Sequence, residues 1–149
     1  MAAEVPCLSD LAERYNPPTF KEASMRSPVT TDKAPRPIGP YSQAILDGDR
    51  IYVSGQGPGN PATGQLELGG AAAQTVRVFE NVRMILEAAG SSLDKVIKCN
   101  VYLKNIGDFA AMNEVYAQTF TPPYPARTTI QAGALPGGIS VEIECIAGR

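Results

Sequence analysis

The stretch that decides the fold is AAAQTVRVFENVRMILEAAGSSLDKVIKCNVYL, residues 71–103. Its first part carries apolar side chains at positions 72, 76, 79, 82 and 86, the spacing of an amphipathic helix over 71–89 that Gly90 can end as a C-cap. Its last part, 96–103, has the two-residue alternation of a strand. The alternation predicts that the side chains of the strand point to two opposite faces. One face carries Val96, Lys98, Asn100 and Tyr102, and the other carries Ile97, Cys99, Val101 and Leu103.

Two strands are expected before this helix, and a helix and two strands after it. Residues 42–46 and 51–54 are apolar runs on either side of Asp47-Gly48, a dipeptide that favours the tight turn of a β-hairpin. Asp108 is the expected N-cap of a second helix, which runs to about Phe120 and ends before Pro122-Pro123. Strands over 127–131 and 140–146 complete the order β-β-α-β-α-β-β.

This order predicts an α+β fold, with a single sheet that carries both helices on one face. In the last strand, Glu142 and Glu144 share a face that points away from the apolar Val141, Ile143 and Cys145. The opposite face of the sheet then has no covering layer. A small sheet with apolar residues on a bare face is usually buried in an oligomer.

The composition excludes several classes of chemistry. The 149-residue chain has no His, so His-based catalytic triads, His-based ribonuclease chemistry and His-bearing zinc sites are excluded. A net charge of −2 and a sequence pI near 5.1 make a nucleic acid an improbable partner. Three separated Cys without a CxxC motif favour the reducing cytoplasm and no metal site. No apolar run is long enough to cross a membrane.

The chain divides near residue 35. All 14 glycines lie from Gly39 onward, and the first 34 residues hold few apolar side chains that a core could use. We therefore expect residues 1–34 to be a loosely structured N-terminal extension, and residues 35–149 to be one α+β domain.

Arg127 is the charge with the clearest functional potential, because its planar fork can hold a carboxylate through two hydrogen bonds. If the last two strands pair in antiparallel fashion, Glu142 or Glu144 lies beside it and can orient a water. The alternatives are an arginine of an edge strand in solvent and a salt bridge on the sheet surface. Gly39-Pro40-Tyr41 and Ser54-Gly55 flank the hairpin, where glycine permits close approach of a ligand or simply makes a turn.

Five segments together resemble, in order and spacing, the Rid (YjgF-type) family of reactive enamine/imine deaminases. They are RPIGPYSQ (36–43), VSGQ (53–56), NEVY (113–116), PART (125–128) and VEIE (141–144). The resemblance implies a chorismate-mutase-like fold and a homotrimer whose bare sheet faces meet, with clefts between subunits. It also implies hydrolysis of 2-aminoacrylate-type intermediates to 2-keto acids and ammonia, without a cofactor.

The resemblance also assigns roles to particular residues. Arg127 would clamp the substrate carboxylate, Glu142 would position or activate water, and Tyr41 would close the cleft. Asn113, Thr129 and the backbone of Ser54 and Gly55 would line the binding site. Thr129 stands where many members have Cys, so that thiol and any oxidation-dependent behaviour linked to it are absent. Gly57 stands where many have a large aliphatic residue, and the smaller residue can enlarge the cleft, which leaves the substrate range open.

Two other functions remain as alternatives. One is a non-catalytic trimeric binder of small carboxylates or 2-keto acids that uses the same Arg127. The other, weaker one is the endoribonuclease activity attached to some of the family's names, against which the acidic pI and the absence of His argue.

Overall fold

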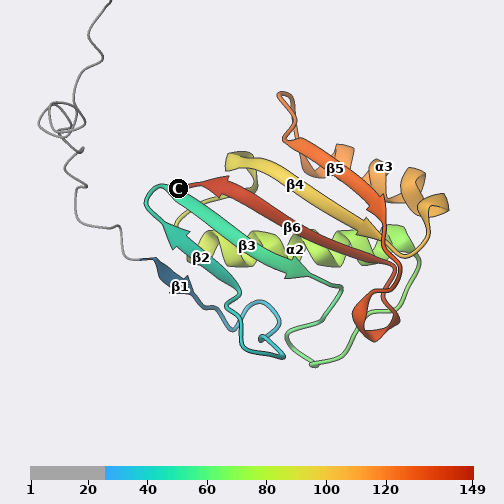
Figure 1. The fold of residues 1–149 in the computed structure, drawn as a ribbon, viewed down its shortest axis with the longest axis horizontal. Helices are drawn as coiled ribbons and strands as arrows, with labels where there is room; N and C mark the ends of the chain where they lie inside the picture. The colour runs from blue at the N-terminus through green and yellow to red at the C-terminus, as the bar shows by residue number, and fades with distance from the viewer. Residues whose placement is uncertain (1–25) are drawn as a thin grey trace, which may run out of the picture.

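A computed structural model describes residues 26–149 of the chain as a six-stranded sheet with two α-helices (Figure 1). The strands follow the spatial order β1-β2-β3-β6-β4-β5. Their bounds are β1 Ser27–Val29, β2 Ala44–Asp47, β3 Arg50–Gln56, β4 Val96–Leu103, β5 Ala126–Gln131 and β6 Val141–Gly148, and the helices are α2 Ala71–Ala88 and α3 Phe109–Thr119. Short 3₁₀ turns lie at Leu93–Lys95, Ile106–Asp108 and Pro136–Gly138.

The hairpin turn and the helix ends lie where the sequence predicts them. Asp47 pairs with Arg50 across a two-residue turn, so the hairpin of β2 and β3 is confirmed. Gly48 adopts a φ of 60°, the left-handed conformation that such a turn requires. Gly90, at a φ of 77°, follows α2 as predicted. Asp108 precedes α3, but its side chain caps no backbone amide there.

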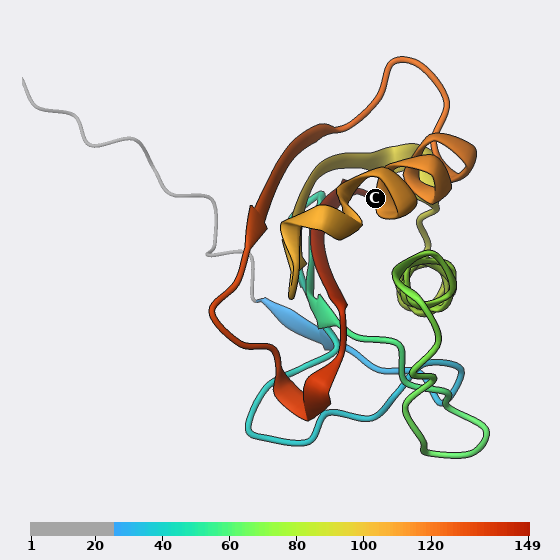
Figure 2. The ribbon, with the colours of Figure 1, turned by 90° about the vertical axis from the view of Figure 1, so that its right-hand side faces the viewer.

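Both helices lie on one side of the sheet (Figure 2), which confirms the expected α+β architecture. The core lies between the layers, where Val78, Ile85 and Leu86 of α2 meet Val101 of β4 and Ile143 of β6. Each of these side chains is almost fully buried. Their removal from water supplies the main driving force for folding.

The pairing of the last two strands differs from the expectation. β5 pairs with β4 in parallel, and β6 lies between β3 and β4, antiparallel to both. The physical reason is the crossover through α3, which returns the chain to the same end of the sheet and so makes β4 and β5 parallel. Arg127 is therefore not beside Glu142 or Glu144.

Two further details correct the sequence analysis. The β4–β6 register shifts between Val96 and Lys98, so Val96 is buried and Ile97 is exposed, the reverse of the expected alternation. The sheet also begins before Pro35, because β1 pairs with β2, and Ala34 is buried. Residues 1–25 of the expected extension lie outside the described residues.

The face of the sheet opposite the helices has no covering layer within residues 26–149. Tyr52 of β3 and Ile130 of β5 stand on it with 45% and 48% of their surface exposed. Polar side chains of Asn100, Tyr102 and Glu144 lie between them on the same face. The bare face is thus a mixture of apolar and hydrogen-bonded polar groups.

Candidate functional site

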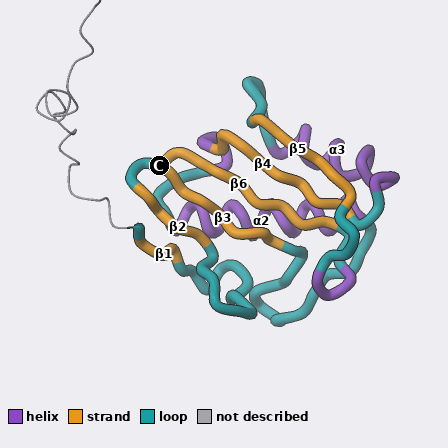
Figure 3. The backbone as a smooth tube through the Cα atoms, viewed as in Figure 1, coloured by secondary structure: helices purple, strands orange, loops and turns teal. Residues whose placement is uncertain are grey.

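A cavity of about 550 Å³ lies at the end of the sheet where β3 ends and β6 begins. Three connections meet there, residues 35–43, 57–70 and 132–140 (Figure 3). The volume falls in the range of about 300–1,000 Å³ that is typical of small-molecule sites. Tyr41, Ser54, Gly55 and Glu142 all line this cavity, so the structure brings these four predicted site residues together.

Glu142 differs from its neighbour Glu144 in its contacts. The Glu144 carboxylate accepts hydrogen bonds from Asn100 Nδ2 at 2.8 Å and from Tyr102 Oη at 3.1 Å. Within residues 26–149, no side chain donates to or pairs with the Glu142 carboxylate. Burial raises the pKa of Glu142 above its ordinary value, and the negative charge of Glu144 raises it further. Glu142 is therefore the carboxylate that is available to a water or a substrate.

A bulge in β3 makes room for this carboxylate. The register between β3 and β6 shifts between Val53 and Gln56, across Ser54 and Gly55. A Cβ atom at Gly55 would overlap Oε1 of Glu142, so a larger residue there would displace the carboxylate from its present position. The Ser54 hydroxyl donates to the Ser42 carbonyl oxygen at 2.7 Å and fixes the bulge against the preceding loop. The backbone at 54–55 thus lies against the Glu142 side chain.

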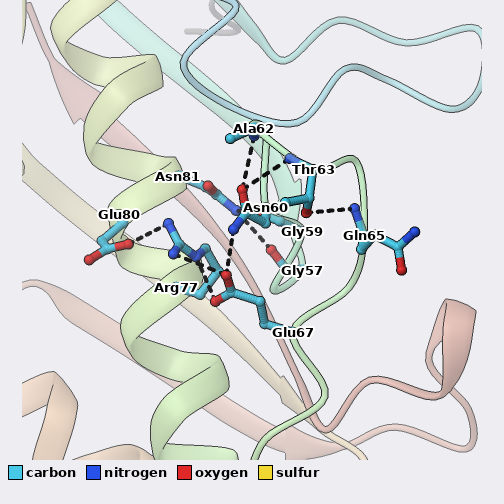
Figure 4. Close-up of polar contacts among 10 residues, drawn as sticks. All are labelled: Gly57, Gly59, Asn60, Ala62, Thr63, Gln65, Glu67, Arg77, Glu80 and Asn81. Atoms are coloured by element: carbon cyan, nitrogen blue, oxygen red, sulfur yellow. Dashed lines mark hydrogen bonds and ion pairs between the residues drawn. The ribbon is translucent and has the colours of Figure 1, made fainter.

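Four buried amide side chains hold the loops around the cavity. Gln43 Nε2 donates to the carbonyl oxygens of Thr31, Ala34 and Pro35, and Gln56 Nε2 donates to those of Ser54 and Gly55. Gln74 of α2 binds the backbone of Gly69 and Ser140. Asn81 Nδ2 donates to the carbonyl oxygens of Gly57 and Gly59 (Figure 4). The loops are fixed before any ligand arrives.

Arg127 lies elsewhere, on the edge strand β5 against α3. Its Cζ lies 4.4 Å from the centroid of the Tyr116 ring and 5.5 Å from that of Phe109. Its Nη2 donates to Asn113 Oδ1 at 2.9 Å. The aromatic rings and the amide hold the guanidinium in one orientation, with donors left for a carboxylate. The structure thus brings Arg127 and Asn113 together.

The two groups of residues lie on opposite faces of the sheet. Arg127 is paired with the buried Cys99 and therefore points to the helix side, whereas Glu142 is paired with Tyr102 on the bare side. Thr129 points to the helix side like Arg127, and its Oγ1 is buried without a hydrogen-bond partner among the described residues. Within one chain, Arg127 and Glu142 cannot contact the same small substrate.

The four buried amides and the apolar side of the cavity could not be predicted from local sequence patterns. Gln43 and Gln56 lie in two of the segments that carry the resemblance, but an amide in a loop gives no local signal of what it will bind. Leu66 and Ile139 also line the cavity, although each stands alone in a turn-rich segment. Only the packing of the loops shows their position.

Cys99 and Cys145 are buried, and burial raises the pKa of the Cys99 thiol to about 11, so that thiol is protonated at neutral pH. Among residues 26–149, no group of three or more His, Cys, Asp or Glu side chains could hold a metal ion. No helix in the same range has the length and apolar character of a membrane span.

Known proteins resemble this chain over most of its length. The family model described as Endoribonuclease L-PSP matches residues 31–148. A RutC family protein of Pyrococcus abyssi is 50% identical over 119 residues, which cover 80% of this chain and 94% of that protein. A Bos taurus protein named 2-iminobutanoate/2-iminopropanoate deaminase is 47% identical over 123 residues, covering 83% and 90% respectively.

Solved structures give the same picture. RidA from an Antarctic Psychrobacter species superposes with a TM-score of 0.80 at 47% identity, covering 83% of this chain and 99% of that one. The YjgF gene product of E. coli gives a TM-score of 0.77 at 38% identity, covering 83% and 98%. With the family model, the relatives and the fold in agreement, the chain belongs to the Rid (YjgF-type) family.

Proposed function

We propose that the chain hydrolyses reactive 2-aminoacrylate-type enamines and their imine tautomers to 2-keto acids and ammonia. The observation that carries the proposal is the Glu142 carboxylate, which faces the cavity without a side-chain partner among residues 26–149 and has a raised pKa. Such a carboxyl can take and return a proton close to neutral pH more readily than an ordinary one. The deaminase names of mammalian relatives support this reaction class.

The reaction needs little from the protein beyond positioning. The enamine takes a proton on its β-carbon and becomes an iminium, whose C2 is electrophilic. Water adds its oxygen to C2 and gives a proton to Glu142, which returns it to the amino nitrogen. The C2–N bond then breaks, ammonia leaves, and the hydroxyl proton passes to solvent to leave the 2-keto acid. Fixing substrate and water together lowers the entropic part of the barrier.

The substrate carboxylate requires a cation, and we assign this role to Arg127 of a neighbouring subunit. Arg127 lies on an edge strand and on the other face of the sheet from Glu142, so one chain holds only half of the site. In a homotrimer assembled through the bare sheet faces, clefts between subunits would join the two halves. The exposed Tyr52 and Ile130 on the bare face support such an assembly. Tyr41, with 48% of its surface exposed, would close the cleft.

The test is the decay of 2-aminoacrylate generated in situ by a serine/threonine dehydratase. We expect the protein to accelerate the decay and the Glu142→Gln variant to lose most of the acceleration. Glu114→Gln, an exposed carboxylate on α3, is the matched control and should retain full activity. Tight binding of 2-keto acids without faster decay would favour the non-catalytic binder. Cleavage of RNA that disappears with Arg127→Ala would favour the endoribonuclease.

A further inference from the structure

The cavity around Glu142 has two chemically different sides. The side near the β3 bulge carries Tyr41, Ser54 and the carboxylates of Glu142 and Glu144. The other side is apolar and comes from the three loops. Its members are Pro35, Pro37, Ile38, Leu66, Pro136 and Ile139. A substrate whose imine group lies near Glu142 therefore has an apolar wall next to it.

The apolar side is built by loops that interlock through glycines. A Cβ at Gly57 would lie 2.9 Å from Ile139 Cδ1, and one at Gly137 would lie 2.7 Å from Leu66 Cδ1. A Cβ at Gly59 would lie 2.9 Å from Pro35 Cγ. These distances are shorter than real Cβ contacts, so a side chain at one of these positions would have to displace Ile139, Leu66 or Pro35 from its present place. The three loops form one continuous wall.

Helix α2 holds the loop that carries Leu66 through polar contacts (Figure 4). Arg77 pairs with Glu67 through Nε at 2.8 Å and with Glu80 at 2.6 Å, and Glu67 also accepts from Asn60 Nδ2 at 2.7 Å. The fully buried Asn81 holds the carbonyl oxygens of the same loop. The loop that carries Leu66 is thus tied to the helix at both of its ends.

Leu66 is nevertheless 44% exposed, and Ile38 is 91% exposed. A pinned loop that keeps large apolar side chains in water has a surface ready to bind an apolar group. The cavity is also far larger than a three-carbon imino acid requires. Gly57 contributes to its size, since a larger residue there would displace the Ile139 side chain.

We propose that this apolar wall is the subsite for the substrate's side chain, with Leu66 and Ile139 as specificity-determining residues. The chain then acts best on 2-imino acids with extended or branched aliphatic side chains. The inference rests on the proposed deaminase function and narrows it to a substrate class. Each methylene that the wall removes from water adds about threefold to fourfold to binding.

The experiment compares 2-imino acids of increasing length. An L-amino-acid oxidase generates them from alanine, norvaline and leucine, and the loss of each imine is followed with and without the protein. We expect kcat/KM to rise about threefold to fourfold per methylene from the alanine to the norvaline imine. Leu66→Ala should lower the norvaline-to-alanine ratio of kcat/KM severalfold. A flat series with the unchanged protein would overturn the proposal.

Leu68→Ala is the matched control, because Leu68 lies on the same loop, is 61% exposed, and does not line the cavity. It should leave the ratio unchanged, and equal effects of the two leucine variants would overturn the proposal.

Calorimetric binding of the corresponding 2-keto acids tests the apolar subsite separately from the deaminase function. If no imine decays faster, the proposed function fails, but affinities that grade with chain length and respond to Leu66→Ala would uphold the subsite. Ungraded affinities would overturn it.

Discussion

The edge strand that carries Arg127 and the cavity that holds Glu142 are built in opposite ways. Arg127 is held by an aromatic face and one amide, and its site is open on the outer edge of the sheet. Glu142 has no side-chain partner in the described chain, but backbone loops pinned by buried amides surround it. One region orients a side chain and leaves its surroundings open, and the other fixes the surroundings and leaves the side chain available. Two such halves suit a site that is completed by assembly.

The largest effect should come from inactivating Arg127 and Glu142 in separate variants and then mixing the two variants. Arg127→Ala and Glu142→Gln should each lower kcat/KM by about 10²-fold or more, because each removes a group that no other described residue replaces. Mixed oligomers made by refolding the two inactive variants together should regain about a quarter of the wild-type activity, since one cleft in four combines an intact Arg127 with an intact Glu142. The imine-decay assay measures both effects.

Arg83→Ala is the control for the arginine variant, because Arg83 makes only a surface ion pair on α2. It should change neither the activity nor the result of mixing. If the mixed oligomers stay inactive although they contain both variants, the two halves do not meet between subunits, and the assignment of Arg127 to a neighbouring cleft is wrong.

The pH dependence of the activity tests the role of the Glu142 carboxylate. In the proposed mechanism deprotonated Glu142 accepts the proton of water. Activity should then rise with pH as this group loses its proton, at a higher pH than for an ordinary glutamate. Glu144→Gln removes a negative charge that raises the pKa of Glu142, so the rising limb should move to lower pH. The amide oxygen of the variant can still accept from Asn100 and Tyr102, and Lys98, which lines the same small pocket as Glu144, is unchanged.

A pH profile of kcat/KM from acid to neutral measures the shift. Glu87→Gln, which removes a distant surface carboxylate on α2, should leave the limb in place. A limb that moves to higher pH, or does not move with Glu144→Gln, would show that Glu142 is not the titrating group.

The sequence predicted local structure well because local structure depends on neighbouring residues. The helix over 71–89, the hairpin at Gly48 and the strand 96–103 each rest on a short-range pattern. The pairing of β5 and the position of β6 between β3 and β4 depend on contacts far apart in the chain, which no periodicity reveals. The resemblance supplied the residues of both halves, whereas their placement on opposite faces required the register of the sheet.

Replacing Asn113, which holds the Arg127 side chain, should have a smaller effect on activity. Its Oδ1 accepts one hydrogen bond from the Arg127 guanidinium. Losing a hydrogen bond to a charged group weakens substrate binding by up to about tenfold when that bond orients the side chain that holds the substrate. Asn113→Ala should therefore raise KM several-fold and change kcat little. Gln118→Ala, an exposed amide on the same helix, should have no effect. A fall in kcat alone would indicate that Asn113 acts on the reacting atoms and not through Arg127.

The smallest effect is expected at Thr129, on the same strand as Arg127. Its hydroxyl is buried without a partner among the described residues, and replacing such a group by a methyl of the same shape removes the cost of leaving it unpaired. Thr129→Val should stabilise the fold by about 1 kcal/mol and raise Tm by roughly 3 °C. Thr128→Val is the contrasting variant, because it removes a hydroxyl that accepts from Lys98 Nζ at 2.9 Å on the bare face, and it should give no such gain. An unchanged KM in Thr129→Val would limit this residue to packing, whereas a KM raised severalfold would show that the hydroxyl binds substrate in the assembled cleft.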